Sequence, residues 1–580
     1  MSEVIIGIDL GTTNSEVAIV QDGKVIIIED NNQKMLPSFV GISDSGEVLV
    51  GEAAKNQYAI YPERTIKSIK RQMGQDVKVS MGDKEYSPQE ISAIILKRLK
   101  SIAENYLGHA VQKAVITVPA YFSDAQRQAT REAGEIAGLE VVRMINEPTA
   151  AALSYEAQQQ AHKKVLVYDL GGGTFDVSVV SIEDDVVEVL ASHGNNQLGG
   201  DDFDNKIVEH IVEHIEDKNN FDISDSPKVM ARISRVAEKA KRALSDAPYI
   251  KLEEEYLCEK NGTPIHLSLE LSRIDYESLI ESYIDETLEA VHIALKGAEL
   301  TVSNIDEVLL VGGSTRTPMI NDRLYQEFKV EPHKEINPDL CVATGAAIQA
   351  AMIAGQSIGS VLVDITPYTF GTSAVGELNG EYYQDTFVPI IHKNSSLPIS
   401  KSEAFCTMYD EQEGVEVIIF QGEDPDALNN IKIGEFFVEG LSDVPAGNVI
   451  TLQLTLDLDG ILQVSAREKA TGLEKSITIN NALSDYEETD IEQAKQRINA
   501  LFNEDETEVF DAKDEEHHEI VKAKALLEKA QRQIEEASAE DKEDMINLIE
   551  QINDAIQAED FATLATATEE LADILYYLDE

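Results

Sequence analysis

Two stretches of the chain share one plan: VIIGIDLGTTNSEVAIV at residues 4–20 and VLVYDLGGGTFDVSVV at residues 165–180. In each stretch an apolar strand runs into Asp-Leu-Gly, a turn of small residues follows, and an alternating strand leads back. An internal repeat of this kind predicts two related lobes, each presenting a hairpin turn to a shared cleft. Residues 1–355 around the repeat alternate strand-like and helix-like segments, which favours an α/β architecture.

The two turns have the composition of a phosphate site. Glycine and threonine leave backbone N–H groups exposed, and concave clusters of such groups bind anionic oxygens. The residues predicted to cradle phosphate are Gly11, Thr12, Thr13 and Asn14 in the first turn and Gly171, Gly172, Gly173 and Thr174 in the second. The strand-ending carboxylates Asp9 and Asp169 suit a hydrated Mg²⁺, which keeps several waters. One such turn is more often only a turn, but two matched copies favour a nucleotide site.

The surrounding sequence excludes two common nucleotide folds. Neither glycine turn opens a helix in a βαβ unit and no Gly-Lys-Ser/Thr follows, so the pattern is neither a dinucleotide fingerprint nor a Walker loop. A third element, VLLVGGSTRTPMI at residues 308–320, is predicted to be a buried strand followed by Gly312 and Gly313. We expect this close-packing turn to lie against the base or sugar of the nucleotide.

The pattern changes in the C-terminal part of the chain. Residues 365–480 carry short alternating runs such as TLQLTLDLDGILQVSA at 451–466, which predict a β-rich domain with a tight turn at Asp459-Gly460. One face of the first strand in that run is predicted to carry Leu452, Leu454, Leu456 and Leu458. Residues 481–580 contain no proline or glycine, and their apolar stripes predict a helical bundle.

Composition limits the partners and the compartment. The chain has 580 residues and a formal net charge of −58, which repels phosphate backbones and anionic bilayers, so neither nucleic-acid nor membrane binding is expected. Its three cysteines form no Cys-x-x-Cys pair, which argues against structural zinc or disulfides and for a reducing compartment. No stretch approaches the ~20 apolar residues of a membrane span. The sequence therefore predicts a cytoplasmic protein.

Seven motifs follow one another in a characteristic order. They are DLGTTNS, TVPAYFSDAQRQAT (117–130), INEPTAAALSY (145–155), DLGGGTFDVS, AEKAKRALS (237–245), LVGGSTRTP and NPD (337–339). Together they resemble the successive signatures of the heat-shock protein 70 family, of the bacterial DnaK type. The resemblance covers essentially the whole chain.

The resemblance implies a multidomain fold. Its parts are an actin-like, two-lobed α/β nucleotide-binding (ATPase) domain at residues 1–355, an interdomain linker at 356–364, a β-sandwich substrate-binding domain at 365–480 and an α-helical lid at 481–580. The implied function is that of a stress-response chaperone, which hydrolyses ATP to ADP and phosphate and thereby switches a peptide clamp from open to closed. The implied cations are Mg²⁺ and K⁺. The expected partners are unfolded or nascent polypeptides, a J-domain co-chaperone of the DnaJ type and a nucleotide exchange factor of the GrpE type.

The matching motif positions also imply residue roles. The catalytic set is Lys70, Glu147, Asp169 and Thr174, in which the lysine stabilises charge on the transferring phosphoryl group and the glutamate positions the attacking water. The metal set is Asp9, Asp169 and Asp176. Besides the two turns, the ATP-binding set contains Glu238, Lys241, Arg242, Ser245, Gly312, Gly313, Ser314, Arg316 and Asp339. The peptide-binding set is Val375, Phe405, Met408, Val415 and Val417, and the set coupling the domains is Pro119, Arg127, Arg143 and Asp364.

Taken singly, several of these residues have simpler interpretations. Without the motifs, Glu238 and Lys241 would be a solvated ion pair one helical turn apart, and Lys70 would be a surface lysine. The alternating valines and isoleucines of residues 365–480 are usually sandwich core. A phosphotransferase of the actin and sugar-kinase superfamily is the main alternative function, but it gives no task to residues 365–580. A filament-forming actin-like protein is a third, which a large C-terminal clamp would obstruct.

Three segments depart from the family pattern. The linker reads SVLVD at residues 360–364 rather than the common VLLLD. GNNQLGGDDFD at residues 194–204 stands where the family usually has GDTHLGGEDFD, so Asn195, Asn196 and Gln197 are unusual. PYTF at residues 367–370 replaces the usual PLSL. These changes are expected to affect communication between domains and the clamp rather than the phosphate site.

Overall fold

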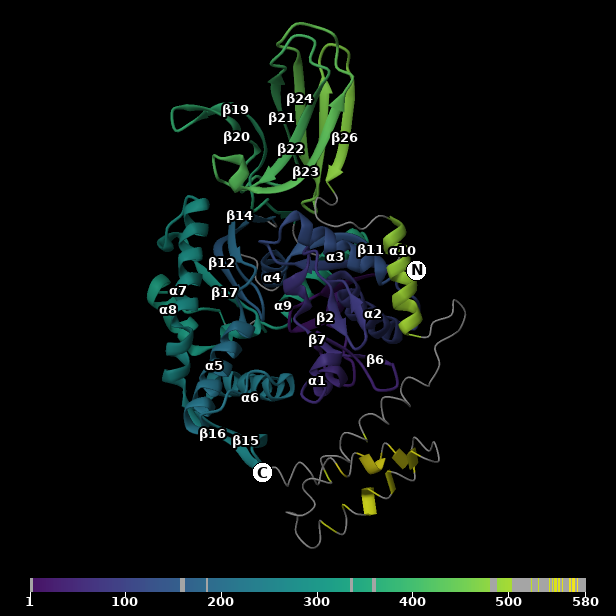
Figure 1. Ribbon diagram of the computed structural model, residues 1–580, viewed down its shortest axis with the longest axis vertical. Helices are drawn as coiled ribbons and strands as arrows, with labels where there is room; N and C mark the ends of the chain where they lie inside the picture. The colour runs from purple at the N-terminus through teal and green to yellow at the C-terminus, as the bar shows by residue number, and fades with distance from the viewer. Residues whose placement is uncertain are drawn as a thin grey trace. The chain divides into compact units, whose positions relative to one another are not determined.

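The computed structural model describes residues 4–156, 162–183, 186–333, 337–356, 361–479 and 488–502, together with scattered positions between 523 and 571. The chain forms two compact units, Met1–Phe502 and Asn503–Glu580. The first unit contains two α/β lobes, a β-sandwich and one further helix (Figure 1). We describe the units separately.

Lobe I is built on a mixed sheet with the strand order β11-β10-β1-β2-β3, and β4 also pairs with β2. The strands of this sheet are β1 (Ile5–Asp9), β2 (Asn14–Gln21), β3 (Lys24–Ile27), β4 (Leu36–Pro37), β10 (Lys113–Val118) and β11 (Glu140–Asn146). The lobe's smaller strands are β5 (Phe39–Ile42), β6 (Val48–Val50), β7 (Thr65–Lys67), β8 (Val79–Met81) and β9 (Lys84–Tyr86). Its helices are α1 (Glu52–Tyr58), α2 (Pro88–Leu107), α3 (Asp124–Ile136) and the 3₁₀ turns η1 (Pro62–Arg64) and η2 (Ile69–Gln72).

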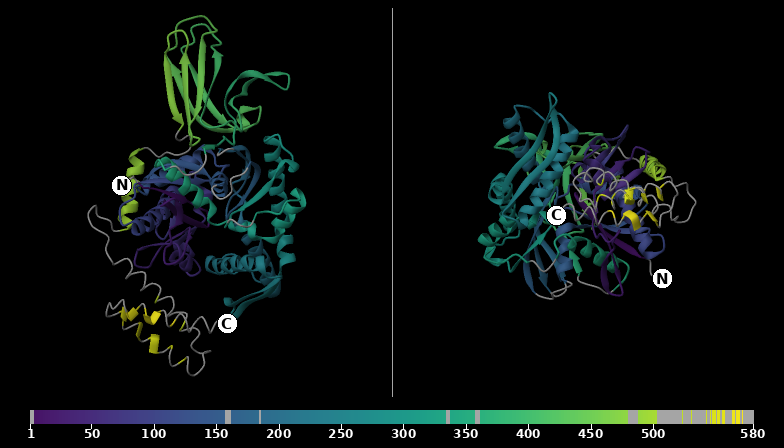
Figure 2. Two further views of the ribbon diagram at one scale, coloured as in Figure 1. Left: turned by 180° about the vertical axis from the view of Figure 1, so that it is seen from behind. Right: turned by 90° about the horizontal axis from the view of Figure 1, so that it is seen from below.

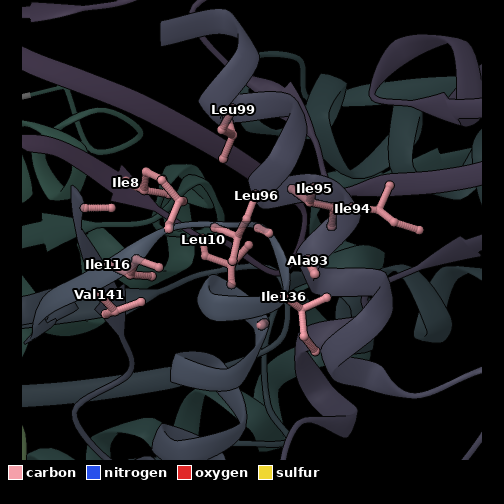
Figure 3. Packing of buried hydrophobic residues seen from close by; sticks show 14 of the residues in the cluster. Ile8, Leu10, Ala93, Ile94, Ile95, Leu96, Leu99, Ile116, Ile136 and Val141 are labelled. Atoms are coloured by element: carbon pink, nitrogen blue, oxygen red, sulfur yellow. The ribbon is translucent and has the colours of Figure 1, made fainter. Parts of the chain in front are cut away.

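Local sequence explains where the two long helices of lobe I begin. Ser87 and Glu90 form a reciprocal capping box at the start of α2, and Ser123 and Gln126 do the same for α3. Both helices turn apolar faces to the sheet, so that Leu96 and its neighbours from α2 meet residues of β1, β10, β11 and α3 in one core (Figure 3). This core fixes the end of β1, from which the first predicted phosphate turn begins.

Lobe II repeats the hairpin of lobe I. Its sheet has the order β17-β12-β13-β14-β18, with antiparallel β12 and β13 matching β1 and β2, and with β17 parallel to β12 as β10 is to β1. These strands are β12 (Lys163–Leu170), β13 (Phe175–Glu183), β14 (Val186–Asn195), β17 (Glu307–Val311) and β18 (Val361–Val363). The lobe also contains β15 (Tyr249–Lys260), β16 (Thr263–Ser272), α5 (Gly200–Asn219), α6 (Pro227–Asp246), α7 (Arg273–Gly297), α8 (Pro318–Phe328), η3 (Val302–Asn304) and η4 (Gly313–Arg316). The predicted internal repeat is therefore confirmed.

Two helices join the lobes. α4 (Glu147–Glu156) and α9 (Cys341–Ile353) contribute alanine-rich faces to a core that also takes side chains from both sheets. Their backbones pack closely, because a Cβ atom on Gly345 of α9 would lie 1.8 Å from the carbonyl oxygen of Ala150 in α4. The contact requires glycine at this position.

The β-sandwich at residues 370–479, which together with residues 365–369 before it we call the clamp, consists of two four-stranded antiparallel sheets (Figures 1 and 2). One sheet has the order β20-β19-β22-β23 and contains β19 (Phe370–Leu378), β20 (Glu381–Ile391), β22 (Gly414–Gln421) and β23 (Ile431–Glu439). The other has the order β21-β24-β25-β26 and contains β21 (Ile399–Cys406), β24 (Val449–Leu456), β25 (Leu462–Glu468) and β26 (Glu474–Ile479). A short 3₁₀ turn, η5 (Ala427–Asn429), precedes β23.

One detail of the predicted alternation is wrong. Leu452, Leu454 and Leu456 are buried on one face of β24, but Leu458 is 46% exposed. The strand ends earlier than predicted because the Asp457 side chain accepts hydrogen bonds from the N–H groups of Asp459 and Ile461 and closes a turn there.

The last helix of the first unit packs on lobe I. In α10 (Glu488–Leu501), Ala494 and Ile498 join the lobe I core, and Arg497 pairs with Glu90 of α2 at 2.7 Å. The predicted lid begins at 481, so its first residues, 481–487, lie outside the described part of the chain. In the second unit the described residues include a buried apolar cluster made of Ala523, Ala530, Met545, Leu548, Ile552, Ala555, Leu564, Ala567 and Leu571.

Candidate functional site

A cavity of about 740 Å³ lies between the two lobes, a size suited to a nucleotide. Of the residues predicted for the ATP site, it is lined by Asp9, Gly11, Thr12, Thr13, Asn14, Lys70, Glu147, Asp169, Gly171, Gly172, Thr174, Glu238, Lys241, Arg242, Ser245, Gly312, Gly313, Ser314, Arg316 and Asp339. Two predicted residues, Gly173 and Asp176, do not line it. The structure thus brings together residues more than 300 positions apart in the sequence.

The two hairpin turns face each other across the cavity. A Cβ atom on Gly172 would lie 1.8 Å from the Thr13 hydroxyl, and one on Gly173 would lie 2.6 Å from the Thr12 methyl group. Glycine at both positions therefore lets the turns approach. Gly173 is covered by lobe I at this contact, which explains why it does not line the cavity.

A buried ion pair lies at the bottom of the cavity. The ammonium group of Lys70, on η2, is hydrogen-bonded to a carboxylate oxygen of Glu147, the first residue of α4. Lys70 is 4% exposed, and Thr117 donates a hydrogen bond of 2.7 Å to Asp9 beside it. Burial raises the pKa of Asp9 and of Glu147, and the charge of Lys70 opposes both shifts.

The same region has more carboxylate than cation. Burial, followed by the charge of Glu147, raises the pKa of Asp169 well above its ordinary value, and Asp169 Oδ2 and the Thr13 hydroxyl are buried without a hydrogen-bond partner. In the described residues, no three acidic, histidine or cysteine side chains converge closely enough to hold a metal alone. This donor set fits a cation that is held mainly by phosphate oxygens and water, with few carboxylates.

Asp176 has a different environment from the other two predicted metal ligands. Its Oδ1 accepts a hydrogen bond of 2.9 Å from the backbone N–H of Tyr121, and burial raises its pKa to about 7. Asp176 therefore lies behind the cavity wall, between the cavity and the loop that follows β10.

The far end of the cavity is formed by one face of α6 and by the loops after β17. Arg242 pairs with Glu238 at 2.7 Å, Lys241 donates to the carbonyl of Gly200 at 2.8 Å, and Arg316 pairs with Asp339 at 2.6 Å. The helical spacing of 238, 241, 242 and 245 predicts this shared face, and all four residues line the cavity.

Several residues that line the cavity were not predicted, and two of them, Lys55 and Glu16, contact predicted residues. Lys55 on α1 reaches across from lobe I to pair with Glu238 at 3.0 Å, so it connects the lobes over the cavity. Glu16 on β2 is hydrogen-bonded to Asp9, and burial raises its pKa well above its ordinary value. Glu16 could have been found from the alternation of β2, which turns it toward the same side as the cavity, but nothing local to Lys55 indicates its partner.

The clamp is tied to lobe II by a strand. β18 pairs in parallel with β14, matching Val361 with Val186, Leu362 with Val187 and Val363 with Glu188. Asp364, which follows directly, is buried and accepts a hydrogen bond of 2.8 Å from Asn146, whose own oxygen accepts one of 2.7 Å from Arg127. Of the predicted coupling residues, Arg127 and Asp364 are therefore connected through Asn146, which was not predicted.

A second contact joins the clamp to lobe I. Asp459, in the turn before β25, pairs with Arg131 of α3 at 2.5 Å and accepts a hydrogen bond of 2.9 Å from the Met144 N–H. The predicted coupling residue Arg143 lies 3.5 Å from the same aspartate, at the edge of this contact. Sequence reasoning assigned Asp459 only to a turn. Pro119, another predicted coupling residue, accepts the N–H of Phe122 and closes the loop after β10.

The predicted peptide-binding residues fall into two groups. Val375 and Met408 are 40% and 49% exposed, whereas Val417 is buried in the core between the sheets. Phe405 and Val415 are partly buried against that core. Burial assigns Val417 a packing role in this structure, while Val375 and Met408 are open to a ligand.

A two-lobed ATPase fold joined by a strand to a β-sandwich defines the class of the protein. The family described as Hsp70 protein matches residues 5–80 and 75–580, so the chain belongs to the Hsp70 family of ATP-dependent chaperones. The chaperone protein DnaK of Thermosipho melanesiensis is 43% identical over 586 residues, covering 98% of this chain and 95% of that protein. The DnaK of Thermotoga neapolitana is 47% identical over 487 residues, covering 82% of this chain and 80% of that protein.

These matches confirm the predicted family, fold class, ATPase activity and chaperone function. They also disfavour the sugar-kinase and filament alternatives, because the match extends through the sandwich and the C-terminal region. In the part of the chain that the structure describes, no helix is long and apolar enough to cross a membrane.

Proposed function

We propose that ATP in the interlobe cavity controls whether the clamp is docked on the ATPase lobes, and that docking opens the clamp to apolar segments of unfolded or nascent polypeptides. The observation that supports this most directly is the pairing of β18 with β14. β14 also pairs with β13, which begins just after the second phosphate turn, so a change at the turn has a short route to the linker.

We assign the chemistry of hydrolysis to the residues at the bottom of the cavity. Lys70 offsets charge on the transferring phosphoryl group, and Glu147, held by Lys70, orients the attacking water. The turns at Gly11–Asn14 and Gly171–Thr174 bind phosphate through backbone N–H and hydroxyl groups. Adenosine is bound by one face of α6 and by the loops after β17. The residues are Glu238, Lys241, Arg242 and Ser245 on α6, and Gly312, Gly313, Ser314, Arg316 and Asp339 in the loops.

Mg²⁺ would be held near Asp9 and Asp169, since Asp169 presents an unpaired buried oxygen there. The positive charge of the ion would offset negative charge on the phosphate oxygens as the bond to the terminal phosphate breaks. K⁺ is a further candidate in the same acidic region. Asp176 is assigned an indirect role, because it is hydrogen-bonded to Tyr121 and lies outside the cavity.

The peptide site is inferred from an incomplete sheet edge. β19 pairs with β22 only at Phe370, Gly371 and Thr372, opposite Gln421, Phe420 and Ile419. Beyond Thr372 the two strands separate, which leaves the first half of β22, from Gly414 to Ile418, paired only with β23. An extended peptide can gain backbone hydrogen bonds at such an edge and contact Val375 and Met408 with an apolar side chain.

The finer organisation and the partners are also proposals. We assign residues 1–355 to the ATPase domain, 356–364 to the linker, 365–480 to the clamp and 481–580 to the lid. A J-domain co-chaperone of the DnaJ type would act where Arg143 and Asp364 meet the docked clamp, and an exchange factor of the GrpE type would open the lobes. Three free cysteines favour a reducing, cytoplasmic location.

Peptide release tests the proposed coupling. A labelled apolar peptide bound to the protein should dissociate faster when ATP is added, and Thr174→Ala should reduce that acceleration because Thr174 lines the phosphate end of the cavity. Asp364→Asn should leave peptide binding in ADP intact while weakening stimulation of ATP turnover by peptide and J-protein. If ATP fails to accelerate release from the wild type, the proposed coupling is wrong.

A further inference from the structure

Three bodies meet at one residue of the loop that follows β10. Tyr121 belongs to lobe I, and its carbonyl oxygen accepts hydrogen bonds from the Tyr368 hydroxyl of the clamp segment at 2.6 Å and from the Asn196 amide of lobe II at 2.7 Å. These two donors occupy both lone pairs of the carbonyl. We call Tyr121, Asn196 and Tyr368 the junction.

The ring of Tyr121 connects the same three bodies. It packs edge-on to His193 of β14, with ring centroids 5.0 Å apart, and against Tyr368, with centroids 4.8 Å apart. Gly194 lets β14 come this close, because a Cβ atom there would lie 2.8 Å from Asp176 and 3.1 Å from the Cβ of Tyr121. The contacts therefore require both a closed position of lobe II and a docked clamp.

The junction is also connected to the nucleotide site. The backbone N–H of Tyr121 donates to Asp176, whose charge acts on neighbouring Asp169 in the cavity wall. The loop around Tyr121 is held in place because Arg127 donates hydrogen bonds to the carbonyl oxygens of Ala120 and Phe122. Since the carbonyl and the N–H of Tyr121 belong to one residue, the donors that position the carbonyl also help to position the N–H that contacts Asp176.

We propose that Tyr368 and Asn196 form a latch at Tyr121, which makes docking of the clamp depend on closure of the two lobes and conveys both to Asp176. The latch rests on the proposed coupling of nucleotide to docking. Both donors lie in segments that depart from the family pattern, Asn196 in 194–204 and Tyr368 in 367–370, and the structure brings them to the same oxygen atom. Tyr368 and Asn196 are positioning residues, since neither lines the nucleotide cavity.

A neighbouring residue offers a matched control. Gln197 also joins lobe II to lobe I, since its side-chain amide donates to the Arg71 carbonyl at 3.1 Å and its backbone carbonyl accepts a hydrogen bond of 2.7 Å from the Arg71 side chain. Unlike Asn196, Gln197 makes no hydrogen bond to the carbonyl oxygen that accepts from Tyr368. A second control, Tyr383→Phe, removes a hydroxyl that is hydrogen-bonded to Asp426 within the clamp.

The test is amide hydrogen exchange of the linker strand β18 in the full chain, at one pH, with ATP and with ADP. Tyr368→Phe keeps the ring and removes one hydrogen bond, so exchange at residues 361–363 in ATP should quicken about fivefold, while Tyr383→Phe should match the wild type. Asn196→Ala should act in the same direction. The Tyr368→Phe/Asn196→Ala double variant should exchange more slowly than the product of the single effects, whereas Tyr368→Phe combined with Gln197→Ala should be multiplicative.

The possible results separate the two proposals. If wild-type β18 exchanges equally in ATP and ADP, nucleotide does not control docking, and both the proposed coupling and the latch fail. If the wild type responds to ATP but Tyr368→Phe exchanges like the wild type, the latch alone is overturned. The latch also fails if, in both double variants, the change in exchange rate equals the product of the changes in the two single variants. Unchanged exchange in the lobe I core of each variant establishes that folding is intact.

Discussion

Docking of the clamp is expected to depend on pH largely through Asp124, and Asp124→Asn should reduce that dependence. Asp124 is the first residue of α3 and lines the contact between lobe I and the clamp, together with Arg127, Tyr368 and Gly460. Burial raises its pKa to about 7, against smaller lowering effects from the N–H of Leu462 and the charge of Arg127. The Asp124 Oδ1 atom is buried without a hydrogen-bond partner.

The sign and size of the pH dependence of docking follow from proton linkage. Undocking is expected to expose Asp124 to water and so to return its pKa toward the ordinary value of 3.8, whereas burial in the docked protein raises its pKa to about 7. The docked state therefore holds the proton more tightly, and its stability is fully present below about pH 4 and is lost as the pH rises toward 7. At about 1.4 kcal/mol per pH unit, the ceiling is roughly 4 kcal/mol. The dipole of α3 acts in both states and largely cancels.

The measurement is energy transfer between a dye on Cys406, which is exposed in the clamp, and a dye on a cysteine introduced in lobe I, with Cys258 replaced by serine. In saturating ATP the docking constant of the wild type should fall at least tenfold between pH 5 and pH 8. Asp124→Asn keeps the shape but cannot ionise, so its profile should be clearly shallower than that of the wild type, and the slope that remains is assigned to Asp364, whose pKa burial also raises. Asp83→Asn, which removes an exposed carboxylate from the turn between β8 and β9, should follow the wild type. A flat wild-type profile, or an unchanged slope in Asp124→Asn, would refute the reasoning.

Three further changes test other parts of the structure. Lys70→Ala should lower kcat for ATP about 10²- to 10³-fold with little change in ATP affinity, and a loss below tenfold in single-turnover assays would contradict its catalytic role. Gly345→Ala places a Cβ atom 1.8 Å from the Ala150 carbonyl oxygen, so it should lower the free energy of unfolding by about 1–3 kcal/mol in thermal denaturation. Val417→Ala should destabilise the clamp by about 2 kcal/mol, whereas Met408→Ala should leave its Tm unchanged and weaken peptide binding. If instead Met408→Ala lowered the Tm and Val417→Ala weakened only peptide binding, Met408 would be the packing residue and Val417 the peptide contact.

Residues whose function depends on local spacing could be predicted from the sequence. The two hairpin turns carry the same Asp-Leu-Gly pattern, and the four α6 residues recur with the period of a helix, so each group must share one surface once its element forms. To predict that the two hairpins face one cleft, the internal repeat had to be recognised as well. The two phosphate turns follow from these local rules, whereas Lys70 and Glu147 were assigned only through the resemblance of their motifs to the family.

The contacts between the lobes and the clamp could not be predicted in the same way. Asp459 contacts Met144 across 315 positions and Asp364 contacts Asn146 across 218, and no periodicity relates such distant residues. Leu458 was misplaced for a related reason. Its alternation continues that of β24, but the side chain of Asp457 closes the turn and overrides the pattern.

Each contact between the clamp and the lobes is weak, and this weakness allows a nucleotide to control whether the clamp is docked. β18 has only three residues and its Val361 is 62% exposed, so its pairing with β14 alone is too short to be permanent. Other contacts include an ion pair at Asp459, a buried carboxylate at Asp364 that is costly to desolvate, and the hydrogen bonds at Tyr121. A ligand moves a two-state equilibrium only by its differential affinity for the two states. Docking through several contacts of about 1 kcal/mol each therefore lies within the range that closure of the cavity on ATP can switch on and loss of ATP can switch off.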